Sequence, residues 1–168
     1  MEAERLIATG RHALTESRTA LDIVAEAWQA QALAQAIGSH LALCGPLELR
    51  SEARGLGEIG GGRGLADHPA VRTGLRAAQL TGVSEARAAL TALGALLGEV
   101  GIALVGVACA TDEEGLYWQC IEAIDAADEA GDRVRAMLRR LAARDRDRER
   151  ARPPDPARGR AGPSGRSD

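Results

Sequence analysis

The first 43 residues carry apolar side chains at helical spacing. No proline occurs in residues 2–43, and glycines are rare there. One helical face collects Ala3, Ile7, Leu14, Leu21, Trp28 and Ala32. Beyond Trp28 the opposite face is apolar as well, so we expect this half of the helix to be buried on nearly all sides. The pattern predicts one long helix, kinked near Gly10 and ended by the Gly-Pro pair at 45–46.

A connector follows, over residues 46–82. Residues 46–54 predict a short helix, whereas residues 55–64 hold six glycines, which are too many for regular structure. Three of these glycines match the G-x-G-x-x-G pattern of dinucleotide-binding loops, but no strand precedes them, so we interpret the segment as a flexible connector. Asp67 is placed to cap a further short helix that begins near Pro69.

Two more helices are predicted, over residues 84–110 and from Asp112 to about Leu141. Thr111 and Glu114 form a capping-box pattern at the start of the second helix. Its apolar face comprises Leu116, Cys120, Ile124, Ala127, Gly131, Val134, Leu138 and Leu141. Because the loop between the two helices is short, they should pack as a tight antiparallel hairpin.

The C-terminal segment differs in composition from the rest. Opposite charges alternate from Arg144 to Arg150, which gives a helix mixed support, and prolines, glycines and arginines follow. We therefore divide the chain into a helical bundle domain, residues 1–144, and a disordered tail rich in Arg, Pro and Gly, residues 145–168. The fold class is all-α, an antiparallel helical bundle with a long first helix, a Gly-rich connector and a C-terminal helical hairpin.

Composition and charge exclude several classes of protein. Hydrophobic residues make up 45% and charged residues 27% of the 168 positions, as in globular proteins. Aromatic residues make up 2%, too few for a platform that stacks single-stranded nucleic acid. Residues 1–141 hold 13 arginines and 19 acids, a net charge of −6, so we expect the folded body not to bind nucleic acid.

The cysteines and the N-terminus indicate a cytoplasmic protein. Cys44, Cys109 and Cys120 lack the spacing of a disulfide framework or a zinc site, and the acidic N-terminus does not resemble a signal peptide. No Glu is followed by His three residues later, as di-iron bundles require. We therefore predict no cofactor, no metal and no catalytic residue.

The run 88–110 also fits a membrane-spanning helix by length, and Gly94 and Gly98 form a GxxxG pair. Glu99 near its middle makes insertion costly, and alanine and glycine contribute little to it. We therefore favour a central helix of a soluble bundle, surrounded by the other helices, over a membrane span.

Glu99 itself is a candidate site residue. A carboxylate in such a helix must face solvent, find a hydrogen-bond donor or have a function, because burial without a partner would raise its pKa and destabilise the fold. His40, Gln31, Gln35 and Gln119 also occur among apolar neighbours. Together with Glu99 these side chains could bind a small polar ligand inside the bundle, although a structural polar stripe is the simpler interpretation.

A second candidate surface lies on the last predicted helix. Trp118, Glu122, Asp125, Glu129 and Asp132 recur on one of its faces. An exposed tryptophan is favoured at protein interfaces, and acidic side chains attract a basic partner, whereas most such stripes are only solvated surfaces. The pattern allows a docking face.

Three stretches of sequence resemble a known family. They are AEAWQAQALAQAIG at 25–38, GEVGIALVGVA at 98–108 and DEEGLYWQCIEAIDAAD at 112–128. They resemble an uncharacterised family of small actinobacterial proteins, classed as a domain of unknown function, over about residues 1–141. The resemblance implies a bacterial protein and supports the cytoplasmic assignment, but it brings no catalytic residues.

The best functional interpretation is a non-enzymatic helical protein-interaction or regulatory module, which could form a homodimer or bind a helical partner. Long amphipathic helices with few aromatic residues must bury a broad apolar area, and association is one way to do so. The alternative is a bundle, or a minor enzyme, that binds a small ligand around Glu99. A membrane-associated helical protein is the third possibility.

Overall fold

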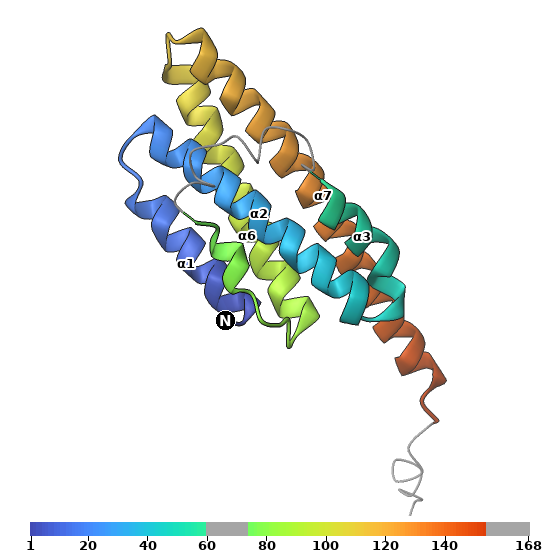
Figure 1. Cartoon of the computed structure of the whole chain (residues 1–168). Helices are drawn as coiled ribbons and strands as arrows, with labels where there is room; N and C mark the ends of the chain where they lie inside the picture. Colours follow the sequence, from blue (N-terminus) through green and yellow to red (C-terminus); the bar gives the residue numbers. More distant parts are fainter. Residues whose placement is uncertain (60–73, 154–168) are drawn as a thin grey trace, which may run out of the picture.

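The computed structural model describes residues 1–59 and 74–153. Its elements are α1 (Ala3–Glu16), α2 (Ala20–Cys44), η1 (Leu47–Leu49), α3 (Arg50–Glu58), η2 (Arg76–Gln79), α6 (Ala86–Ala110) and α7 (Glu114–Ala151). Within the described ranges the chain forms helices and no strands, so the predicted all-α class is confirmed. Figure 1 shows α2 crossing in front of α6, with α1 on one side and α7 and α3 on the other.

The prediction of a single long first helix is wrong. The chain stays helical through Gly10 but ends α1 at Glu16, and α2 begins at Ala20. Thr19 is the physical reason, because its hydroxyl accepts a hydrogen bond from the Asp22 amide at 3.1 Å. The Asp22 carboxylate accepts one from the Thr19 amide at 3.0 Å, which completes a capping box. The cap starts a new helix, and α1 folds back against α2 and α6.

The glycine-rich connector is also partly helical, contrary to the prediction. Helix α3 continues through Gly55 and Gly57 to Glu58, after a single 3-10 turn at Leu47–Leu49. A Cβ added to Gly38 of α2 would lie 2.7 Å from the Gly57 amide nitrogen. The two backbones therefore touch, and only glycine permits this approach. The helix predicted near Pro69 lies outside the described residues.

The hairpin of α6 and α7 is present, but its predicted capping box does not form. Thr111 ends α6, where its amide donates to the Val107 carbonyl, and its hydroxyl accepts a hydrogen bond from the Glu113 amide at 3.1 Å. Glu113 is the N-cap, without a side-chain capping bond, so α7 starts at Glu114. Thr111 therefore lies two residues before the N-cap, and its hydroxyl stabilises the turn between the helices instead of capping α7.

Helix α7 is longer than predicted. It continues ten residues past Leu141, to Ala151, through the first part of the segment 145–168 that the sequence assigned to a disordered tail. Arg144 lies 3.9 Å from Glu48, and Arg150 lies 3.6 Å from Asp147 one turn earlier, so both sequence-distant and local charges support this end. The rest of the predicted tail, residues 154–168, lies outside the described residues.

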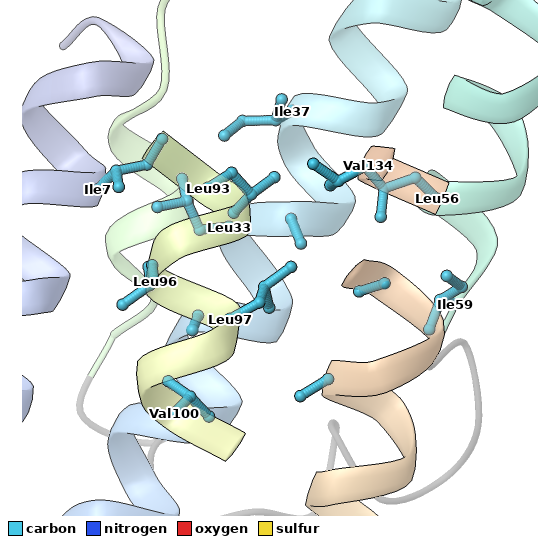
Figure 2. Close-up of a cluster of buried hydrophobic side chains, with 14 of the residues drawn as sticks. Ile7, Leu33, Ile37, Leu56, Ile59, Leu93, Leu96, Leu97, Val100 and Val134 are labelled. Carbon is cyan, nitrogen blue, oxygen red and sulfur yellow. The ribbon is translucent and has the colours of Figure 1, made fainter. Parts of the chain in front are cut away.

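The core lies between α2 and the hairpin, as Figure 2 shows for Leu33 and Ile37 of α2 facing Leu93 and Leu97 of α6. Every residue from Ala27 to Ala34 is buried, as expected, but Ser39 and Leu43 further along are exposed, so burial on nearly all sides holds only for the first part of the predicted stretch. Helix α2 contacts α1, α3, α6, α7 and η2. It is therefore α2 that the others surround, whereas the sequence assigned this place to residues 84–110.

Candidate functional site

Glu99 lies on the surface of α6 and binds Arg11 of α1. Its two carboxylate oxygens lie 3.0 and 3.1 Å from Nε of Arg11, and Nη2 of Arg11 also contacts the carboxylate. The Glu99 side chain is 40% exposed. The hydrogen bond from Arg11 lowers the pKa of Glu99 against the opposing effect of desolvation. Glu99 therefore has both solvent exposure and a donor, but the donor is Arg11 and not the expected His or Gln.

Gln31 and Gln35 form hydrogen bonds at the C-terminal end of α3. Both side-chain amides donate to the carbonyl oxygen of Ile59, Gln31 at 3.4 Å and Gln35 by a short contact. Ile59 follows the last residue of α3, where a helix leaves carbonyls without internal partners. Within the described ranges, Oε1 of the buried Gln31 has no hydrogen-bond partner. This pair caps a helix by bonding to its backbone, and neither residue is bonded to Glu99.

The two remaining members of the predicted polar set lie elsewhere. Gln119 is exposed on α7. His40 is half-buried near the end of α2 and lines a surface pocket of about 440 Å³. Of the five predicted ligand residues, only Gln31 and Gln35 meet, at the Ile59 carbonyl, and the structure does not bring the set together around Glu99.

The pocket beside His40 collects polar groups from three helices. Its polar lining comprises His40 and Cys44 from α2, Ser84, Glu85 and Arg87 at the start of α6, and Arg144 and Asp145 from α7. Asp145 lies in ion pairs with both arginines, and Nε of Arg144 is 3.7 Å from its carboxylate. Because Glu85 and Asp145 balance the two arginines, the pocket is close to neutral. Over the described part of the chain, no three His, Cys, Asp or Glu side chains are grouped to hold a metal ion.

Sequence reasoning missed this pocket because its members are up to about a hundred positions apart. The only local signal was the four-residue spacing of His40 and Cys44, which places both on one face of α2. That spacing alone cannot show that α6 begins beside them. The pairing of Arg87 with Asp145, which links α6 to α7, could not be found from spacing at all.

The second predicted surface is found as one exposed row on α7. We call it the Trp118 face, and it consists of Trp118, Glu122, Asp125, Glu129 and Asp132. Trp118 is 59% exposed, and its ring packs edge-on against Tyr117 with 5.4 Å between ring centroids. Asp132 pairs with Arg135, whereas the other three acids are in no ion pair with any described residue. The face combines an exposed aromatic ring with uncompensated negative charge.

Helix α6 is long and apolar enough to cross a membrane by length and composition, with a hydropathy of 2.0 over its most apolar window. Core helices of soluble proteins can be equally long and apolar, but only 33% of the most apolar 18-residue stretch of α6 is buried in the bundle. Ile102 is 77% and Val105 49% exposed. The far end of the hairpin therefore presents apolar surface that the rest of the bundle leaves uncovered.

Comparisons with known proteins identify the chain by family. A model of a family of unknown function, DUF6099, matches residues 1–140. No curated protein and no solved structure matches the chain. The match spans α1 to most of α7 and ends eleven residues before α7 does. The chain therefore belongs to DUF6099, a family of unknown function.

Proposed function

We propose that this protein is a non-enzymatic protein-interaction module whose Trp118 face binds a basic helical segment of a partner protein. The exposure of Trp118 beside uncompensated acids is the observation that carries the proposal. A large aromatic side chain that stays in water loses the free energy that burial would give, and tryptophan is enriched among the residues that dominate binding energy. The three free cysteines fit a reducing compartment.

The charge of the Trp118 face selects the kind of partner. Its four acids span about 15 Å along α7, and a cation-rich helix of three turns would lie along them. The net charge of −6 on residues 1–141 adds long-range attraction for such a segment. We expect binding to weaken as salt is added, because the acids are exposed and screened.

Site-specific photo-crosslinking tests the proposal. Benzoylphenylalanine at position 118 should capture a discrete partner in cells of the source organism, whereas the same group at Leu43, which is 78% exposed on α2, should not. The purified partner should then bind the full chain, and Trp118→Ala should raise the dissociation constant by about 30-fold. Equal capture at both positions, or an unchanged affinity for the alanine variant, would show that this face is only solvated.

The pocket beside His40 supports a second candidate function, the binding of a small polar ligand. Within the described ranges, Nε of Arg144 has no hydrogen-bond partner and lies 3.7 Å from the Asp145 carboxylate, so a ligand carboxylate that displaces Asp145 could accept a hydrogen bond from it. This moves the ligand hypothesis away from Glu99, which already binds Arg11. Thermal-shift titration with small carboxylates and phosphate tests it: stabilisation of the wild type that is lost in Arg144→Gln supports the site, and no stabilisation by any of them rejects it.

A further inference from the structure

The outer face of α6 is a continuous row of exposed, uncharged side chains. We define it as Thr91, Ala95, Gly98, Ile102, Val105 and Cys109, all of which are exposed. Their spacings are four, three, four, three and four residues. This row lies on the side of α6 opposite the buried row that includes Leu93, Leu97 and Leu104. No charged residue interrupts it over about 27 Å of helix.

The composition of this face indicates the kind of surface that would cover it. Spacings of three and four residues follow from helix geometry alone, and the acidic Trp118 face has them as well. The outer face of α6 differs because it carries no charge and exposes Ile102 and Val105, as does a seam that packs against one other helix. On its α1 side the seam is bordered by the Arg11–Glu99 ion pair, which marks a polar rim beside an uncharged centre.

We propose that the outer face of α6 is covered by the same face of a second copy of this chain, with the two α6 helices antiparallel and related by a two-fold axis at Gly98. Ala95 and Gly98 are small and Ile102 is large, whereas Thr91 and Val105 are of similar size. In this arrangement Ile102 meets Ala95 of the second copy, and Val105 meets Thr91. A parallel pair would set large against large and leave a gap at the small half, which close packing disfavours.

Charge favours the same orientation. Antiparallel pairing brings the acidic turn at 112–114 beside the N-terminal end of α6 of the second copy, where Glu85 and Asp145 offset the charge of Arg87. The positive end of each helix dipole would then lie near negative charge. A parallel pair would instead place the two acidic turns side by side.

A stable dimer would need more area than the seam alone. The seam would bury roughly 300–400 Å² per copy, taken as about 27 Å of helix about 10 Å wide plus side-chain contacts. A typical specific interface buries about 800 Å² per copy, so the rims of α1 and α7, which flank α6, would have to contribute the rest. This dimer goes beyond the proposed function, because it uses a different face from Trp118.

Disulfide trapping tests both the contact and its orientation. In a full-length background with Cys44→Ser and Cys109→Ser, where Cys120 is buried, Gly98→Cys should form a covalent dimer on mild oxidation, because the axis brings the two positions together. Ala95→Cys and Ile102→Cys should each stay monomeric alone but cross-link when the two variants are mixed. Cross-linking of all three variants alone would establish a parallel pair and overturn the proposed orientation, and no cross-linking would overturn the dimer.

Light scattering with size-exclusion chromatography gives the matching equilibrium test. The wild type should be a dimer, and Ile102→Glu should raise the dimer dissociation constant by at least about 100-fold, because each interface would bury two unpaired carboxylates. Leu43→Glu is the matched control, since Leu43 is equally exposed, 78% against 77%, but lies on α2. A control variant that dissociates as far as Ile102→Glu would overturn the proposal.

Two further outcomes separate this inference from its competitors. A monomeric wild type that floats with phosphatidylglycerol vesicles, and loses this binding in Ile102→Glu, would show that lipid covers the face and would overturn the dimer. Trp118→Ala should leave the dimer unchanged. Loss of the dimer in that variant would contradict the assignment of the two functions to two faces, whereas loss of partner binding alone would leave the dimer intact.

Discussion

Gly38→Ala should destabilise the protein although alanine is the better helix former. A Cβ at Gly38 would lie 2.7 Å from the Gly57 amide nitrogen and 2.8 Å from the Ala53 carbonyl oxygen. Both atoms belong to the backbone of α3, so no side chain can rotate away. Helix α3 must move by at least several tenths of an ångström, and Leu56, which is fully buried against the core, must move with it.

The magnitude follows from two opposing effects. Overpacking of this kind costs about 1–3 kcal/mol, and a clash with backbone belongs at the upper end. Replacing glycine by alanine inside a helix returns about 1 kcal/mol. The net destabilisation should be about 2 kcal/mol, which corresponds to a fall in Tm of roughly 4–8 °C for a chain of this size.

Urea unfolding followed by circular dichroism at 222 nm measures this change, at one fixed protein concentration so that association does not bias the comparison. Gly101→Ala is the matched control, because it lies inside α6 and nothing lies within 4 Å of its added Cβ. It should stabilise the protein by about 0.5–1 kcal/mol. A Gly38 variant as stable as the wild type would refute the backbone contact between α2 and α3.

Three further predictions concern the cap of α2, the half-buried Glu52 and the thiols. Thr19→Ala removes the hydroxyl that caps α2 and should cost about 1 kcal/mol in urea unfolding; an unchanged midpoint would contradict this role. Hydrogen bonds from arginines of α7 lower the pKa of Glu52, whose side chain is 18% exposed. The ionised Glu52 therefore stabilises the fold above the unfolded-state pKa of about 4.3. This stabilisation is lost as the pH falls through the lower folded-state pKa. Glu52→Gln should therefore reduce stability by about 1 kcal/mol at pH 7 and match the wild type at about pH 2, and a difference that persists in acid would contradict it. Burial raises the pKa of the Cys120 thiol. Ellman's reagent at pH 8 should therefore react quickly with the exposed Cys44 and Cys109, and with Cys120 only after unfolding. Rapid reaction of all three thiols in the folded protein would contradict the burial of Cys120.

The fold class and the helical hairpin follow from local sequence pattern. The helical repeat of apolar residues predicted α6 to within two residues, and it predicted the burial of α2 on all sides over Ala27–Ala34. Such patterns are local, because one turn of helix relates residues only three or four positions apart. The break at Thr19 was also present locally, in the T-x-x-D of a capping box, but the apolar repeat that runs across it hid the signal.

The tertiary structure decided which glycines are helical and which polar groups meet. Gly55 and Gly57 look like helix breakers in isolation, yet contact with α2 places Gly57 in a helix, because close packing there offsets the roughly 1 kcal/mol that glycine costs. Glu99 finds Arg11, 88 residues away, and no spacing rule connects them. The same holds for the outer face of α6: its repeat is visible in the sequence, but only the packing of α1, α2 and α7 shows which side of the helix they leave uncovered.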